Sequence, residues 1–381
     1  MKILVTGAKG FVGKNLSAEL LNISEGKCIF DGIPKGVQVF CTDIDTPCET
    51  LREYCSDCDF VFHLAGVNRP ETTDEFAKGN TDSLRQLVSF LKEAGNTCPV
   101  ALSSSTQAAL DNPYGESKRQ AEIFLSEYGK EAGVKTYIFR FPGIFGKWCR
   151  PNYNSVVATF CHNIANNLPI RIDDREREIR LVYIDDVVRS LLMCVVDSVT
   201  RDDENFCRVL PEHNVTLGKI ADLLESFRDG RRKLQVPGLS DPFVSALYAT
   251  YLSYLPKDEF SYPLDTHSDH RGSFTEIIRT PDRGQFSVNI SKPHITKGNH
   301  WHHTKNEKFC VVSGTGVIRF RRIDSDEVIE YFVSGDKIEV VDIPTGYTHN
   351  IENLGDTDMI TFMWASEAFD PNRPDTFFLE V

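Results

Sequence analysis

The first thirteen residues, MKILVTGAKGFVG, constrain the fold of this chain more than any other stretch. KILVTG is a short apolar run that ends in glycine, a pattern typical of a strand buried on both faces of a parallel sheet. Gly7, Gly10 and Gly13 follow at GxxGxxG spacing, and the helical pattern KNLSAELL begins at once. Such a turn lets the backbone and the free NH groups of a helix start approach a pyrophosphate. The stretch therefore predicts a dinucleotide-binding domain.

Two later apolar runs extend the predicted sheet. DFVFHLAG, residues 59–66, ends in small residues against which an adenosine could lie, and PVALSSS, residues 99–105, ends in three serines. Doubly wound sheets place their ligands at the carboxyl ends of such strands. Tyr114 and Lys118, in YGESK, follow one helical turn apart and share a helix face. Because a nearby ammonium lowers the pKa of a phenol from about 10, this pair predicts a proton-transfer centre.

In this order, GxxGxxG, HLAG, SSS and YxxxK resemble the motifs of the extended short-chain dehydrogenases/reductases. RFPGIFG (140–146) and VYIDDVV (182–188) resemble the motifs that precede the nucleotide-sugar subdomain of that family. The resemblance covers residues 1–245. It implies an α/β doubly wound Rossmann domain, which we expect to occupy residues 1–250.

The resemblance also implies catalytic roles. Tyr114 would be the acid/base and Lys118 its electrostatic partner and ribose ligand. Ser105 would bond to the substrate oxygen, with Ser104 as the alternative if the strand ends one residue earlier. Two features depart from the family: the nine-residue step from Ser105 to Tyr114 is short, and Gly143 stands where the family often has asparagine.

Two residues bear on the choice of cofactor. Asp43, in VQVFCTD, could bind a ribose 2'-hydroxyl and so favour NAD. Lys9, inside the glycine loop, suits a 2'-phosphate, and we expect NADP(H) with NAD as the alternative. The predicted cofactor contacts are the glycine loop, the HLAG turn, the acid and the catalytic pair: Gly7, Lys9, Gly10, Phe11, Val12, Gly13, Asp43, Leu64, Ala65, Gly66, Tyr114 and Lys118.

The last third of the chain has a different pattern. Short strand-like runs such as FSVNIS, KFCVVSG and GVIRFRRI alternate with turns, which indicates an antiparallel sandwich or barrel. His300, His302 and Glu307 lie at HxHxxxxE spacing, and His349 lies in PTGYTHNIEN. Two histidines two apart on a strand share a face, so the four side chains could bind zinc or another first-row divalent ion. His303 and His294 fall outside this pattern.

HxHxxxxExxxxxxG and PxGxxHxxxN together resemble the cupin superfamily, which implies an all-β jelly-roll barrel over residues 260–381. The boundary is expected near residues 250–262, where aromatics suggest a packed connection. KGNH and DHRGSFTE are similar to nucleotide-sugar epimerase cupins, in which the first histidine, here His300, can act as a base without metal. Lys297 and Tyr347 flank the motifs and are candidates for the second acid/base.

The whole chain resembles bifunctional capsular polysaccharide synthesis enzymes. The resemblance implies C3 epimerisation of UDP-2-acetamido-2,6-dideoxy-β-L-arabino-hexos-4-ulose in the cupin, and NADPH reduction at C4 to UDP-2-acetamido-2,6-dideoxy-L-talose, an N-acetyl-L-fucosamine precursor. It also implies a homodimer. The alternative is a 4-keto sugar nucleotide reductase whose cupin only binds metal or dimerises.

Composition excludes other classes of partner. The formal net charge of -13 would repel nucleic acid and anionic membranes, and no apolar run reaches the roughly 18 residues of a spanning helix. Eleven scattered cysteines fit reduced thiols. We therefore expect a cytoplasmic enzyme with no nucleic acid or membrane partner.

Overall fold

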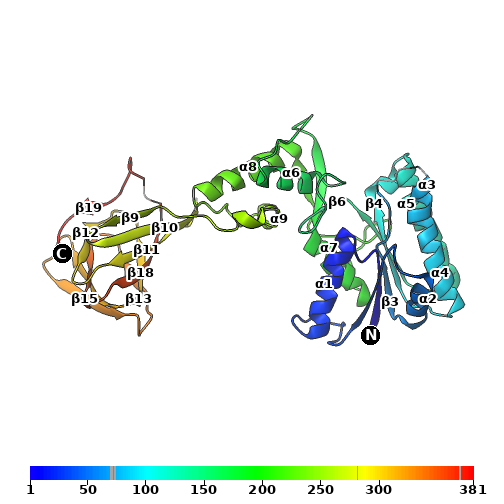
Figure 1. The fold of residues 1–381 in the computed structure, drawn as a ribbon, viewed down its shortest axis with the longest axis horizontal. Helices are drawn as coiled ribbons and strands as arrows, with labels where there is room; N and C mark the ends of the chain where they lie inside the picture. Colours follow the sequence, from blue (N-terminus) through cyan, green and yellow to red (C-terminus); the bar gives the residue numbers. More distant parts are fainter. Residues whose placement is uncertain (69–71, 73, 281, 369) are drawn as a thin grey trace. The chain divides into compact units, whose positions relative to one another are not determined.

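The computed structural model describes residues 1–68, 72, 74–280, 282–368 and 370–381 (Figure 1). The chain divides into two compact units, one of Met1–Leu224 with Ala246–Leu255 and one of Glu225–Ser245 with Pro256–Val381. The last changeover, between Leu255 and Pro256, falls inside the expected boundary region of residues 250–262. The functional limits 1–250 and 260–381 stay a prediction, because residues 225–245 pack with the second unit.

The first unit is built on a parallel sheet in the order β2-β1-β3-β4-β5. Its strands are β1 (Lys2–Thr6), β2 (Gln38–Thr42), β3 (Phe60–His63), β4 (Val100–Ser105) and β5 (Thr136–Phe141). β1 pairs in parallel with β2 on one side and β3 on the other, so the strand order reverses beside β1. Doubly wound sheets bind ligands at the carboxyl ends of strands at such a point.

Helices cover both faces of this sheet (Figure 1). α1 (Phe11–Glu25) and α7 (Ile184–Val195) lie on one face, where Ile3 and Val5 join their core. α2 (Cys48–Asp57), α4 (Ser83–Glu93) and α5 (Pro113–Ala132) lie on the other, where Leu4 joins a second core. Because successive side chains of a strand point to opposite faces, one continuous apolar run supplies both cores.

The rest of the first unit holds smaller elements. A mixed sheet joins β6 (Gly143–Phe145), β7 (Glu178–Tyr183) and β8 (His213–Thr216). α3 (Asp74–Phe76) leads into a π-helical segment, η1 (Ala77–Asp82), and η2 (Thr106–Ala109) follows β4. α6 (Val156–Ala165) also lies in this unit, α8 (Leu217–Arg232) and α9 (Pro242–Leu252) each contain residues of both units, and η3 (Lys257–Glu259) belongs to the second unit. Thr216, the residue before α8, accepts a hydrogen bond from the Lys219 NH and so caps this helix.

The second unit contains two antiparallel sheets. One has the order β16-β13-β18-β11-β10-β9 and the other β15-β14-β17-β12-β19. Phe309, Val311 and Met359 from the first sheet share a core with Ile318, Phe320 and Ile351 from the second. The strands are β9 (Thr266–Asp269), β10 (Gly272–Thr280), β11 (Gly284–Ser291), β12 (Thr296–Trp301), β13 (Glu307–Ser313), β14 (Thr315–Arg322), β15 (Val328–Ser334), β16 (Val341–Ile343), β17 (Tyr347–Asn353), β18 (Met359–Ala365) and β19 (Phe377–Phe378).

The structure confirms the expected division into a parallel α/β part and an all-β part. Among the described residues, no helix has the length and apolar character needed to cross a bilayer.

Candidate functional site

The glycine loop forms a tight turn between β1 and α1. Gly7 has a φ of 68°, and a Cβ there would lie 2.7 Å from the Ala65 nitrogen. A Cβ on Gly13 would collide with the Gly7 carbonyl. α1 begins at Phe11, and no side chain caps its first NH groups. The backbone here is therefore open to a ligand, as the chemistry of a pyrophosphate requires.

A cavity of about 590 Å³ lies over this loop, within the range typical of ligand sites. It is lined by ten of the twelve predicted cofactor contacts: Gly7, Lys9, Gly10, Phe11, Val12, Gly13, Leu64, Gly66, Tyr114 and Lys118. The other two lie behind the loop. Ala65 packs against Gly7, and Asp43 accepts a hydrogen bond from the Lys9 NH at 2.8 Å. The residues present fit a dinucleotide, because the glycines leave room and free donors.

Lys9 and Asp43 lie together at the end of β2. The Lys9 ammonium forms an exposed ion pair with Asp45, whose carboxylate raises the pKa of Lys9. A 2'-phosphate binding to Lys9 would displace this pair. Asp45 is a residue that sequence reasoning missed, although it lies two positions after Asp43.

The predicted catalytic pair, Tyr114 and Lys118, lies at the start of α5. Asn112 caps the helix by accepting a hydrogen bond from the Gly115 NH at 2.8 Å, so Tyr114 falls in the first turn and Lys118 one turn later. The Lys118 ammonium donates to the Ser103 carbonyl at 3.0 Å. Burial lowers the pKa of Lys118 to about 8, and the Glu122 carboxylate opposes the shift. Lys118 is therefore a cation at neutral pH that loses its proton more readily than an exposed lysine.

The expectation that Lys118 lowers the pKa of Tyr114 is wrong for this structure. Burial raises the pKa of Tyr114, while a hydrogen bond with Ser105 acts in the opposite direction. The reason is geometric: the Lys118 ammonium bonds to the Ser103 carbonyl and lies 5.9 Å from the centre of the Tyr114 ring. Tyr114 is held as a neutral phenol, the form that donates a proton.

The two candidate serines point to different partners. Ser105 bonds to Tyr114 and accepts from the Gln107 NH at 3.2 Å. Ser104 is buried and donates to Glu122 at 2.5 Å. Glu122 also forms an ion pair with Arg140 at 2.7 Å. The structure thus brings Ser105 to Tyr114, and it adds a buried pair that sequence reasoning missed, although Glu122 lies one turn after Lys118.

The four predicted metal ligands converge in the second unit. His300 and His302 come from β12 and the residue after it, Glu307 from β13 and His349 from β17, and one ligand atom from each lies within 4.8 Å of the others. Glu307 Oε2 is 3.5 Å from His302 Nε2 and 3.4 Å from His349 Nε2. These three atoms are buried without a hydrogen-bond partner.

This donor set fits a divalent metal. Buried polar atoms without partners are rare, and three imidazole nitrogens with one carboxylate oxygen are the ligands that zinc prefers. Burial lowers the pKa of His300 to about 4, so the ring is neutral at neutral pH, as a ligand must be. Burial raises the pKa of Glu307, but the close approach of His302 and His349 outweighs it and holds that pKa far below its ordinary value.

A segment after β18 orients one of these ligands. The Asp375 carbonyl lies 2.5 Å from His302 Nδ1, which assigns the proton to Nδ1 and turns the Nε2 lone pair toward the cluster. The Asp375 carboxylate accepts from the NH groups of His303, Thr304 and Lys305. These bonds hold the pKa of Asp375 well below its usual range, although burial raises it. Sequence reasoning missed Asp375, which lies 68 residues from Glu307 and outside both motifs.

β12 contains an irregularity that changes which side chains share a face. Gly298 pairs with Asn350 and His300 with His349, so Asn299 is an extra residue without a partner across the ladder. Asn299 has a φ of 59°, a conformation that asparagine tolerates. Its side chain accepts a hydrogen bond from Asn350 at 2.9 Å. This β-bulge brings Lys297 and His300 to the same side of the strand.

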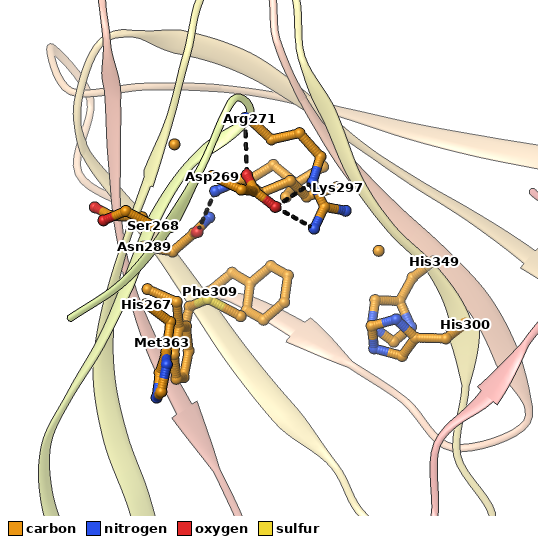
Figure 2. Close-up of a pocket in the computed structure, with 15 residues that line it drawn as sticks. His267, Ser268, Asp269, Arg271, Asn289, Lys297, His300, Phe309, His349 and Met363 are labelled. Atoms are coloured by element: carbon orange, nitrogen blue, oxygen red, sulfur yellow. Dashed lines mark hydrogen bonds and ion pairs between the residues drawn. The ribbon is translucent and has the colours of Figure 1, made fainter. Parts of the chain in front are cut away.

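Both residues line a cavity of about 360 Å³ (Figure 2). Phe309, His349 and Met363 form other parts of its wall, and Asp269 and Arg271 lie on the Lys297 side. The two nearby histidines that fall outside the motif pattern do not join the cluster: His303 packs against Trp301 and Phe377, and His294 pairs with Asp356 at the surface. Tyr347 is not among the cavity-lining residues.

Two family models match the chain. The NAD dependent epimerase/dehydratase family matches residues 3–205, and the polysaccharide biosynthesis C-terminal domain matches residues 267–377. The first match covers the glycine loop and the Tyr114 centre, and the second covers the four clustered ligands.

Full-length relatives carry both parts. A UDP-2-acetamido-2,6-beta-L-arabino-hexul-4-ose reductase of Pseudomonas aeruginosa is 44% identical over 381 residues, which cover 100% of this chain and 99% of the relative. The crystal structure of the capsular polysaccharide assembling protein CapF from Staphylococcus aureus matches with a TM-score of 0.91 and 55% identity, with 100% of each chain covered. A structure of CapF with the inhibitor 3-isopropenyl-tropolone matches with a TM-score of 0.86 and 50% identity, also over 100% of each chain.

Proposed function

This chain belongs to the NAD dependent epimerase/dehydratase family as a full-length relative of CapF, and on that premise we propose that it acts twice on one UDP-4-keto sugar. The all-β unit is a cupin that inverts C3, and the parallel α/β unit reduces C4 with NADPH. The substrate is UDP-2-acetamido-2,6-dideoxy-β-L-arabino-hexos-4-ulose and the product UDP-2-acetamido-2,6-dideoxy-L-talose. One observation carries the proposal: one chain holds a reductase-type centre and, in another unit, a buried metal-type cluster.

The reduction follows from the first centre. Ser105 and the neutral Tyr114 phenol hold the sugar C4 oxygen, and Tyr114 donates its proton to that oxygen. The Lys118 cation, held by the Ser103 carbonyl, would bind the ribose of the cofactor. NADPH supplies the hydride when bound. Lys9 would contact its 2'-phosphate, and Gly7, Gly10 and Gly13 would leave room for its pyrophosphate.

The order of the two steps follows from the chemistry of the ketone. The C4 carbonyl acidifies the hydrogen on C3, and reduction removes that activation. Inversion at C3 therefore precedes reduction at C4. Once C4 is an alcohol, the hydrogen on C3 is no longer acidic, so the inverted configuration at C3 is fixed.

His300, His302, Glu307 and His349 would hold the divalent ion, for which zinc suits the ligands best. A bound ion supplies Lewis-acid polarisation of the sugar carbonyl. The partnerless nitrogens of His302 and His349 support metal binding over the alternative in which His300 acts as a base without metal. Elemental analysis of the purified protein tests this choice.

The alternative is a reductase whose cupin is only a structural, metal-binding or dimerisation module, and one feature favours an oligomeric role. β15 is an edge strand with exposed Val328, Ile329, Tyr331 and Phe332. A long apolar edge is a surface that folded proteins normally cover. We propose that a second copy of the chain covers it in a homodimer. Sedimentation of wild type and Phe332→Lys tests the dimer without testing the epimerase.

Incorporation of deuterium from the solvent at C3 distinguishes an enzyme that only reduces C4 from one that also epimerises C3. In deuterated water, wild type with NADPH is expected to form a product that carries deuterium at C3. Tyr114→Phe should exchange C3 without oxidising NADPH, whereas His349→Ala should lose the exchange. If the wild-type product carries no deuterium at C3, the single-activity alternative is correct.

A further inference from the structure

Inversion of C3 requires a base on one face of the sugar and an acid on the other. We propose that Lys297 is the catalytic residue that delivers the proton to C3, on the face of the sugar opposite to the one that loses its proton. This inference rests on the proposed C3-epimerase function and adds to it the identity of the second proton-transfer group.

The bulge in β12 places Lys297 in the cavity. Lys297 pairs with Ile351 across the ladder, and His300 pairs with His349. His349 and Ile351 are two residues apart on β17, so their side chains lie on the same face of the sheet. The side chains of their ladder partners, His300 and Lys297, therefore lie on that face too. In an unbulged strand, Lys297 and His300 would point to opposite sides, because they are three residues apart. The extra residue, Asn299, is what brings both into one cavity.

Two hydrogen bonds hold the Lys297 ammonium in place. It donates at 2.8 Å to the Asn289 side-chain oxygen and at 2.8 Å to the Ile290 carbonyl. An ammonium has three donors, so one remains for a ligand in the cavity. Gly272 lies beside it, and a Cβ there would sit 3.2 Å from the Lys297 nitrogen and collide with the Ile290 carbonyl. The backbone therefore approaches the lysine closely and leaves it little freedom.

The charges around Lys297 make it a good proton donor. Both of its hydrogen-bond acceptors are neutral, and the nearby Asp269 carboxylate is engaged by Arg271 at 2.7 and 2.9 Å (Figure 2). Burial lowers the pKa of Lys297, with Asp269 opposing and Arg271 supporting the shift. An ammonium with a lowered pKa gives up its proton more readily near neutral pH than an exposed one.

The step balances without a redox partner. The C3–H bond breaks, its proton goes to the base, and its electron pair forms an enolate with the C4 carbonyl. A new C3–H bond then forms on the other face with a proton from Lys297, and the carbonyl returns. Water reprotonates the amine and removes the proton from the base. Nothing is oxidised or reduced.

Other groups fit this role less well. His267 also lines the cavity, but it lies on β9, whose four residues are all exposed, so its ring is not fixed by packing. Arg271 cannot give up a proton at any working pH. Tyr347, the other residue that flanks the motifs, does not line the cavity.

The experiment uses the full chain with the keto sugar in deuterated water and without NADPH, read by NMR for deuterium at C3 and for configuration. Wild type is expected to exchange and invert. In Lys297→Met, exchange with retention should continue while inversion falls about 10²–10⁴-fold, the usual contribution of a general acid. Lys297→Arg keeps the charge but holds its proton, so the same loss is expected. Ethylamine should restore inversion to Lys297→Ala.

Lys292→Met is the matched control, because Lys292 lies in the same unit and pairs with Asp358 at the surface. It should invert at the wild-type rate, and every variant should keep wild-type metal content. Inversion by Lys297→Arg at the wild-type rate would overturn the proton-donor role. So would loss of exchange together with inversion in Lys297→Met with metal retained. Wild type that shows no C3 exchange overturns the epimerase function itself, an outcome distinct from failure of Lys297 alone.

Discussion

The two candidate centres differ in how their polar groups are satisfied. In the first unit, Lys118 bonds to the Ser103 carbonyl and Ser105 bonds to Tyr114. In the second, the facing atoms of His302, Glu307 and His349 are buried without partners among the described residues. A buried polar atom without a partner costs about 1–3 kcal/mol. The proton-transfer groups of the first centre therefore satisfy one another, whereas the facing atoms of the second are arranged as the binding of a further group would require.

Removal of the Tyr114 hydroxyl tests the first half of this comparison and should have the largest effect. Without the proton donor, reduction at C4 by Tyr114→Phe is expected to fall about 10²–10⁴-fold. NADPH oxidation with the keto sugar measures it. Because the metal cluster lies in another unit, C3 exchange and metal content should stay at wild-type levels. Full NADPH oxidation by the variant would contradict the assignment.

Loss of one ligand tests the second half. The binding free energy of structural zinc is about 10–16 kcal/mol. If one ligand of four contributes a quarter of it, His349→Ala should bind the metal roughly 10²–10³-fold more weakly. Metal content after dialysis against a chelator measures it, with His303→Ala as the control because His303 lies outside the cluster. If His349→Ala keeps its metal, the four-ligand site is wrong.

Asp375 is the exception in the second centre, because its carbonyl oxygen gives His302 Nδ1 a hydrogen-bond partner within the protein. Asp375→Ala removes the side chain that fixes residues 303–305 and loosens the carbonyl beside His302. Loss of such an outer contact lowers metal affinity about 10–100-fold. Competition with a chelator measures the change, and Asp356→Ala, at the surface, is the control. Equal affinity in both variants would show that Asp375 has no part in the site.

A pH titration gives the smallest of these effects. Because the pKa of Lys118 is lowered to about 8, its cation is present below that pH and is lost above it. The rate of reduction is therefore expected to be level below about pH 7 and to fall up to about tenfold per unit above about pH 8. C3 exchange, measured in the same samples, does not depend on Lys118. A reduction rate that stays level to pH 10 would exclude this role of the cation.

What could be predicted from sequence differs between the centres for a physical reason. Gly7 and the Tyr114–Lys118 pair act through local geometry, a turn and one helix face, which a short stretch encodes. The sequence did not reveal Glu122, because its partner Arg140 comes from another element. The predicted direction of the Tyr114 pKa shift was wrong, because the Lys118 ammonium turns toward the carbonyl of Ser103 on a neighbouring strand.

The convergence of the four clustered side chains was predicted in full because two spaced motifs encode it. The surroundings of this cluster were not. Strand alternation puts Lys297 and His300 on opposite faces, and only the pairing register reveals the bulge at Asn299. The Asp375 contact depends on how a later segment returns to β12, which no local pattern specifies.

That returning segment makes the metal site vulnerable to a single backbone cut. All four proposed ligands precede Asp375 in the chain, so a protease that cleaves between Asp370 and Asp375 leaves every one of them in place but cuts the covalent link to the carbonyl that orients His302. Nicked protein would keep its full set of metal-binding residues and still release the ion more readily. Metal retention is thus a sensitive measure of whether this stretch of backbone is intact.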